Sequence, residues 1–314
     1  MEKENKSTRK SRLNETTKQD IKEKLNIDAD SELLSPTVDY VFKRIFTADE
    51  KYSKAALIDF INSLLEYQND DKIVDLTIVN PQIPVDKGTQ KKSIFDIRAK
   101  YNNGRQAVIE MQKELTPDFR KRSQHIISKA YASQEISGMD YSVLEKCYLI
   151  CITDFNIITD TVKYIDDYRY RDRQGKDLSD AQTIIFLDLS NIASVLTKNV
   201  DEMTSVEMWV IFFKYVTDNS KKEILNKILE REAGIKMAKN ILNAVSKDEE
   251  ARAYYESELI FELDQRGRMN QAMRQGKEEG KIEVALNLIK MGFPDNQVSE
   301  ATGLTKSEIE SLKN

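Results

Sequence analysis

The sequence is poor in the residues that build soft metal sites. Its 314 residues include one histidine, His125, and two cysteines, Cys147 and Cys151. These cannot form a Cys/His zinc cluster or a His-rich metal site. Any chemistry must therefore run mainly on carboxylates, amines, amides and hydroxyls. The two cysteines lie in an apolar stretch, which predicts a buried strand with two unreactive thiols rather than a disulfide.

Residues 1–30 lack a run of apolar side chains. They mix eight Lys/Arg with seven Asp/Glu, which predicts neither a signal peptide nor a membrane anchor and favours a disordered or loosely helical arm. We therefore expect a cytoplasmic protein without a membrane partner. The whole chain is 40% hydrophobic and 32% charged, so it has enough apolar content to bury a core.

The rest of the chain mixes helical and strand patterns, which predicts an α/β fold. Apolar spacing predicts helices near 38–46 and 57–65, strands at 93–100 and 106–113, and a helix over 117–137. Strands are expected at 148–153, 162–169 and 183–189, and a helix at 205–216. After 217 the composition favours amphipathic helices. We expect an arm at 1–30, a main domain at 31–217, a helical extension with a charged linker at 218–280, and a small helical tail at 281–314.

The chemistry is concentrated in a predicted hairpin around Asn102-Asn103-Gly104. A three-residue loop ending in glycine places Asp96 directly opposite Glu110, with Arg98 and Gln112 on the same face and apolar residues on the other. A two-residue loop would mix acidic and apolar groups on both faces. The apolar pattern therefore favours the longer loop.

Two carboxylates opposite each other repel, and a bound cation removes that penalty. Mg²⁺ takes hard oxygen ligands, usually one or two carboxylates completed by waters and substrate phosphate. The alternative is an ordinary amphipathic hairpin whose outer face carries acids. Residues 87–131 hold eleven Lys/Arg and four Asp/Glu, a net +7 in a chain of −5. A basic band around paired acids favours an enzyme that acts on a phosphate backbone.

The motif Asp96, thirteen residues, Glu110-Met111-Gln112 is similar to the core of PD-(D/E)XK nucleases in which glutamine replaces the lysine. The chain resembles the recombination-promoting nuclease (Rpn) family, also described as PD-(D/E)XK nuclease family transposases. The resemblance is carried further by the segment 36–46, Arg122 with Ser128-Lys129 and Tyr131, Gly138 with Tyr141, and Thr302-Gly303-Leu304.

The resemblance implies a restriction-endonuclease-like core, with a central mixed β-sheet flanked by helices and an all-helical C-terminal region. It implies Mg²⁺-dependent DNA endonuclease activity, with Mn²⁺ as the alternative cation. Asp96 and Glu110 would bind the metal, Gln112 would orient water or phosphate, and Asp39 would complete the acidic set. The motif lysine is missing, and Lys113 points to the opposite face of a regular strand. The expected replacements and DNA contacts are Arg98, Arg120, Lys121, Arg122 and Lys129.

Other interpretations remain open at this level. Asp39 and Lys43 stand four residues apart, so a surface ion pair explains them as well as a catalytic role. The basic residues 120–122 open a helix and fit either a solvated face or phosphate contacts. The competing function is a catalytically inactive nucleic-acid-binding or assembly protein that forms a homo-oligomer through its C-terminal helices. A third hypothesis is a tail that binds DNA independently.

Overall fold

The computed structural model describes residues 33–66, 72–80, 82–83, 93–94, 96–134, 138, 140–157 and 163–313. The arm expected at 1–30 lies outside them, as do Lys87, Lys91 and Lys92 of the basic window. The chain divides into two compact units, 1–256 and 257–314. Among the described residues, no helix combines the length and apolar character needed to cross a lipid bilayer.

The first unit contains a six-stranded mixed sheet in the order β1-β4-β5-β6-β8-β7. Neighbours β5, β6 and β8 are parallel, and the other pairs are antiparallel. A separate two-stranded ladder joins β2 and β3. The strands are β1 (Leu76–Ile78), β2 (Gln82–Ile83), β3 (Ser93–Ile94), β4 (Ile97–Tyr101), β5 (Gln106–Gln112), β6 (Cys147–Thr153), β7 (Ile165–Tyr168) and β8 (Gln182–Asp188).

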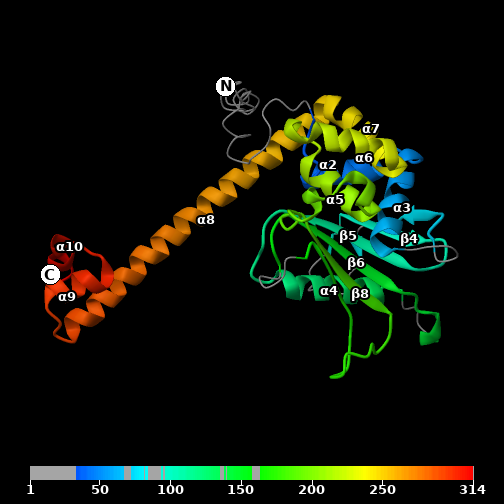
Figure 1. The fold of residues 1–314 in the computed structure, drawn as a ribbon. Helices are drawn as coiled ribbons and strands as arrows, with labels where there is room; N and C mark the ends of the chain where they lie inside the picture. Colours follow the sequence, from blue (N-terminus) through cyan, green and yellow to red (C-terminus); the bar gives the residue numbers. More distant parts are fainter. Residues whose placement is uncertain are drawn as a thin grey trace, which may run out of the picture. The chain divides into compact units, whose positions relative to one another are not determined.

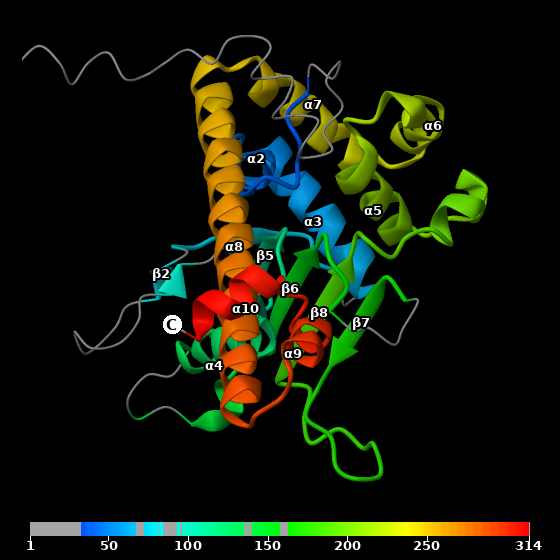
Figure 2. The same ribbon diagram turned by 90° about the vertical axis from the view of Figure 1, so that its left-hand side faces the viewer.

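Helices account for most of the remaining structure (Figures 1 and 2). They are α2 (Asp39–Thr47), α3 (Tyr52–Leu65), α4 (Phe119–Ala132), α5 (Ser205–Tyr215), α6 (Lys222–Arg231), α7 (Ala233–Lys247), α8 (Glu249–Lys290), α9 (Asp295–Thr302) and α10 (Lys306–Leu312). Short 3-10 helices span Tyr141–Val143, Val195–Thr197, Val200–Glu202 and Asn219–Lys221. The architecture confirms the predicted mixed sheet with flanking helices and a helical C-terminal region.

Both faces of the sheet centre are buried. On one face, α4 packs against Val108 of β5 and the odd-numbered residues of β6, and this cluster includes Phe119, Ile126, Ile127, Cys147, Leu149 and Cys151. On the other side lie α2, α3, α5 and α7 (Figure 1). Every residue of β5 from Gln106 to Met111 is buried. The acid-bearing face of β5 is therefore not a solvent face, which disagrees with the alternative of an amphipathic hairpin for that strand, whereas β4 does alternate between buried and more exposed residues.

The helical side of the sheet is held by a buried aromatic cluster. Phe46, Phe60, Trp209 and Phe213 have ring centroids 5.3–6.3 Å apart, and each is fully buried. Such edge and tilted contacts add to the free energy of area burial. The cluster fixes α2, which carries Asp39 and Lys43, against α3 and α5.

Two predicted boundaries are wrong. The strand expected at 93–100 is divided into β3 and β4 by a bend at Asp96. The helix expected at 117–137 ends at Ala132. The predicted strand around the cysteines is confirmed as β6, and both cysteines are buried free thiols.

The second unit is a small helical cluster. Ala285, near the end of α8, packs with Val298 of α9, with Leu304 of the following connection and with Ile309 of α10. Gly303 ends α9 in the left-handed region with φ +75°, as expected of a helix C-terminus. The described part of 281–314 is helical throughout apart from short connections, as the predicted helical tail requires.

Candidate active site

The site is built on the hairpin of β4 and β5, whose register is the predicted one. Arg98 pairs with Val108, and Ala99 pairs with Ala107. Gly104 has φ +86°, which a glycine adopts without strain. Continuation of this register past Ile97 brings Asp96 opposite Glu110. The Asp96 backbone N–H donates to Glu110 Oε1 at 3.2 Å.

Asp96 lies at the bend before β4, and its carboxylate is held by two donors. The Met111 backbone N–H donates to Asp96 Oδ2 at 2.8 Å. Lys43 Nζ on α2 lies 3.3 Å from Asp96 Oδ1. The side chain is 11% exposed. At this bend the Asp96 carboxylate therefore connects the hairpin, through Met111, with α2, through Lys43.

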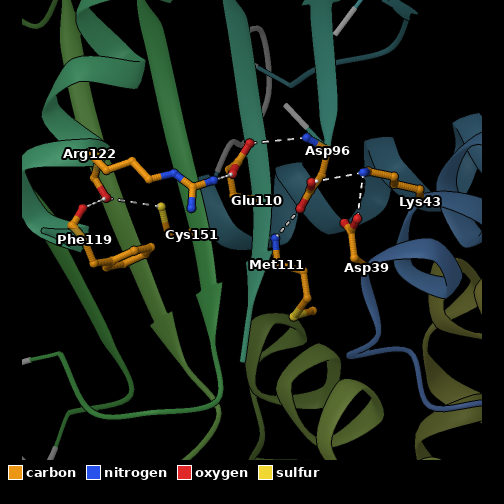
Figure 3. Close-up of polar contacts among 9 residues, drawn as sticks. Asp39, Lys43, Asp96, Glu110, Met111, Phe119, Arg122 and Cys151 are labelled. Atoms are coloured by element: carbon orange, nitrogen blue, oxygen red, sulfur yellow. Dashed lines mark hydrogen bonds and ion pairs between the residues drawn. The ribbon is translucent and has the colours of Figure 1, made fainter. Parts of the chain in front are cut away.

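Glu110 lies within β5 and is paired with a different helix. Its side chain is 2% exposed, and Arg122 Nη2 of α4 donates to Oε2 at 3.2 Å. Figure 3 shows Arg122 and Lys43 approaching from opposite sides, with Glu110 and Asp96 between them. The carboxylates of β5 and of the bend before β4 are thus enclosed by two cations from two helices.

Asp39 completes the group from the first turn of α2. Lys43 Nζ donates to Asp39 Oδ2 at 2.8 Å, while Asp39 Oδ1 is buried without a hydrogen-bond partner. We refer to Asp39, Lys43, Asp96, Glu110 and Arg122 as the acid cluster. A buried oxygen without a donor is unfavourable, so the acid cluster has an acceptor available for a cation.

The electrostatics of the acid cluster disfavour ionised carboxylates. Burial, followed by the negative charges of Glu110 and Asp39, raises the pKa of Asp96 to about 8. Burial also raises the pKa of Glu110 to about 7, although the charge of Arg122 opposes the rise. Burial lowers the pKa of Lys43, but its hydrogen bond to Asp39 and the charge of Asp96 outweigh this, and the net pKa is raised. An added cation would stabilise the ionised acids.

The donor set fits a hard divalent cation. Asp39, Asp96 and Glu110 offer only carboxylate oxygens, the ligands that Mg²⁺ and Mn²⁺ accept. Within the described ranges, no three His, Cys, Asp or Glu side chains converge on one metal position. Mg²⁺ needs only one or two protein carboxylates when waters and phosphate complete its shell. Asp96 and Glu110 could supply that share.

The other residues predicted at the site are spread more widely. Gln112 is half-buried at the end of β5, two positions beyond Glu110. The guanidinium of Arg98 donates to Gln106 Oε1 at 3.0 Å and to Ser133 Oγ at 2.7 Å. Arg98 is therefore held toward the loop end of the hairpin, and no contact described for it reaches the acids.

The basic residues of α4 divide in the same way. Arg122 joins the acid cluster, whereas Arg120 donates to the carbonyl of Ile157. Lys121 is exposed, and Lys129 is half-buried two turns beyond Arg122. The structure thus brings one of the four basic helix residues to the acids. Lys43 is the cation that sequence reasoning missed at Asp96, because its spacing from Asp39 shows the helical pair but not the contact with the hairpin.

Comparison with known proteins gives one match. The model of the family described as PD-(D/E)XK nuclease family transposase matches residues 36–272. This span is more than half of the chain and contains the whole acid cluster. Neither curated proteins nor solved structures gave a match.

Proposed function

The chain belongs to the PD-(D/E)XK nuclease family transposases, and from this premise we propose that it is an Mg²⁺-dependent DNA endonuclease that hydrolyses phosphodiester bonds at the acid cluster. The observation that carries the proposal is the burial of Asp96 and Glu110 side by side at the sheet centre, with pKa values raised to about 8 and about 7. A structural role alone does not explain why two acids are kept there at that cost.

In this proposal Asp96 and Glu110 bind the cation, and Asp39 supports it through its unpartnered Oδ1. The metal, when bound, would activate a water and neutralise charge on the scissile phosphate. Mn²⁺ is the alternative cation. We propose the cytoplasm as the location of this activity, and the support for it is that both cysteines are buried free thiols.

The neighbouring cations have separate roles. Lys43 opposes the rise in the pKa of Asp96 and supplies positive charge in place of the missing motif lysine. The Arg122 side chain is 46% exposed, so it can hold Glu110 in the free protein and turn to a phosphate oxygen when DNA binds. Gln112 orients the water or the phosphate, and Lys121, Arg120 and Lys129 contact the DNA backbone.

A plasmid-cleavage assay tests the proposal. Purified protein is incubated with supercoiled plasmid and Mg²⁺ or EDTA, alongside the variants Asp96→Asn and Glu110→Gln. We expect EDTA to abolish nicking. Each variant should lower the nicking rate at least about 100-fold, because each substitution removes a carboxylate that would bind the metal ion, and the charge of that ion would stabilise the transition state. Glu223→Gln, an exposed acid in α6, is the matched control and should cleave normally. Equal nicking in all reactions would contradict the proposal.

The acid cluster also supports a second candidate, a DNA-binding protein without turnover. Lys43 and Arg122 already pair with both acids, so the carboxylates are satisfied in the free chain. DNA binding without cleavage under Mg²⁺ or Mn²⁺ would favour this candidate. A Mg²⁺-induced rise in Tm that disappears in Asp96→Asn separates a working metal site from a purely structural ion-pair network.

A further inference from the structure

Within its own unit, 257–314, helix α8 contains a long stretch that no described residue covers. Every side chain from 267 to 279 is exposed, and nothing in the described chain lies within 4 Å of a Cβ built on Gly267, Gly276 or Gly280. Glycine weakens a helix interior. Neither packing among the described residues of its unit nor helix propensity accounts for this part of α8.

The same helix exposes large apolar side chains. Phe261 is 63% exposed, Met269 is 70% exposed and Met273 is 74% exposed. Phe261, Gln265 and Met269 follow one another at intervals of four, so they lie along one stripe of the helix. Ala272 and Gly276 continue this stripe with small residues.

Charges along α8 are separated by sign. The segment 256–264 has four acids and no Lys or Arg, namely Glu256, Glu258, Glu262 and Asp264. The segment 266–277 has four basic residues and no Asp or Glu, namely Arg266, Arg268, Arg274 and Lys277. Gln265 lies between the two segments. A helix with this pattern is complementary to a reversed copy of itself.

We propose that α8 pairs antiparallel with α8 of a second copy of this chain, with a two-fold axis at Gln265. Reversal about this position places Phe261 against Met269 of the partner subunit. Glu262 and Arg266 occupy one flank of the stripe, and Asp264 and Arg268 occupy the other. A two-fold axis brings like flanks together, so Glu262 faces Arg266 of the partner subunit and Asp264 faces Arg268 of the partner subunit.

The charge pattern also selects the orientation. A parallel pair in register would place the acidic segment against the acidic segment and the basic one against the basic one, which is unfavourable. The antiparallel pair instead joins opposite charges at both ends and encloses the apolar stripe. The charge pattern therefore favours a second copy of α8 as the partner of this helix face, in the antiparallel orientation.

Charge reversal of the full-length chain tests the pairing. Sedimentation is expected to give twice the chain mass of 36.3 kDa for the wild type. Glu262→Arg with Asp264→Arg should give monomers, as should Arg266→Glu with Arg268→Glu. An equimolar mixture of the two variants should restore the dimer, which a folding defect would not allow. Glu278→Arg with Glu279→Arg is the control and should remain dimeric.

Cross-linking tests the direction. Phe261→Cys mixed with Met269→Cys should form a disulfide-linked dimer under oxidation, while either variant alone should not, and the native cysteines are buried. A monomeric wild type, reversal variants that stay dimeric, or no restoration on mixing would overturn the proposal. Cross-linking of Phe261→Cys alone would overturn the antiparallel direction.

Discussion

At the scale of single residues, the acid cluster is a set of charges held in place against their own repulsion. Asp96 is nearly buried beside Glu110, and Lys43 and Arg122 offset only part of the cost. In a buried ion pair, the attraction between the charges offsets the free-energy cost of desolvation only when both groups also have their hydrogen bonds. The two acids to which we assign metal binding are thus also residues whose burial weakens the folded state when they are ionised.

This cost gives a prediction about pH. The folded pKa of Asp96 is about 8, against about 4 in an unfolded chain, so the folded state binds more protons between these values. Stability must therefore fall as the pH rises through this window. We expect the Tm of the wild type, measured in EDTA, to fall from pH 5 to pH 8.5. The Tm of Asp96→Asn should fall less over the same range. At pH 8.5 the variant should be more stable by about 1 kcal/mol or more, or about 2–4 °C.

The control for this measurement is Glu223→Gln, whose Tm should follow the wild type at every pH. Thermal unfolding followed by circular dichroism gives the comparison directly. Parallel curves for wild type and Asp96→Asn would contradict the raised pKa. Mg²⁺ should narrow the difference between the two proteins at high pH by binding the ionised acids of the wild type.

At the scale of elements, the approach of α7 to α3 depends on one glycine. A Cβ on Gly234 would lie 2.2 Å from Asp59 Cγ and 2.4 Å from its Cβ, distances that no packing tolerates. Asp59 is itself fixed, because Trp209 Nε1 donates to Asp59 Oδ2 at 3.0 Å. The first turn of α7 is therefore tightly packed against α3 and Trp209 of the aromatic cluster, with no space for a side chain at position 234.

Gly234→Ala is accordingly expected to destabilise the protein by about 1–3 kcal/mol through overpacking. Thermal unfolding followed by tryptophan fluorescence reports on Trp209, the single tryptophan. Gly267→Ala, where nothing lies within 4 Å of the added methyl, is the matched helical control and should not lower the Tm. If both variants unfold alike, the close approach of α7 is not important for stability.

Elements were also what the sequence predicted best. The loop glycine and the apolar alternation were enough for the register of β4 and β5, and so for the pairing of Asp96 with Glu110. The bend at Asp96 was missed because it depends on the Met111 N–H and on Lys43, which only the folded chain brings together. Arg98 was placed on the correct strand, but alternation does not show that Gln106 and Ser133 capture its guanidinium.

At the scale of the whole molecule, charge is distributed unevenly. The chain carries −5, yet α4 begins with Arg120, Lys121 and Arg122 next to the acid cluster. DNA binding should therefore depend on a local basic surface and should be sensitive to salt. The net charge alone would have argued against a nucleic-acid partner.

Lys121→Gln tests this localisation. Losing one phosphate contact should reduce the slope of log affinity against log salt by about 1 without altering the acid cluster. The affinity is measured in EDTA so that the DNA stays intact. Lys227→Gln on α6, an exposed lysine away from α4, should leave the slope unchanged. The localisation would be rejected if the two variants reduced the slope equally.

The burial of the two acids also bears on how such chains change over generations. Under the proposed function, selection for cleavage would retain Asp96 and Glu110, while selection for folding would act against them. At high pH, a copy released from the first pressure would gain stability from an uncharged residue in place of Asp96. Loss of the proposed activity would therefore require no loss of structure, and inactive copies of this fold should remain folded.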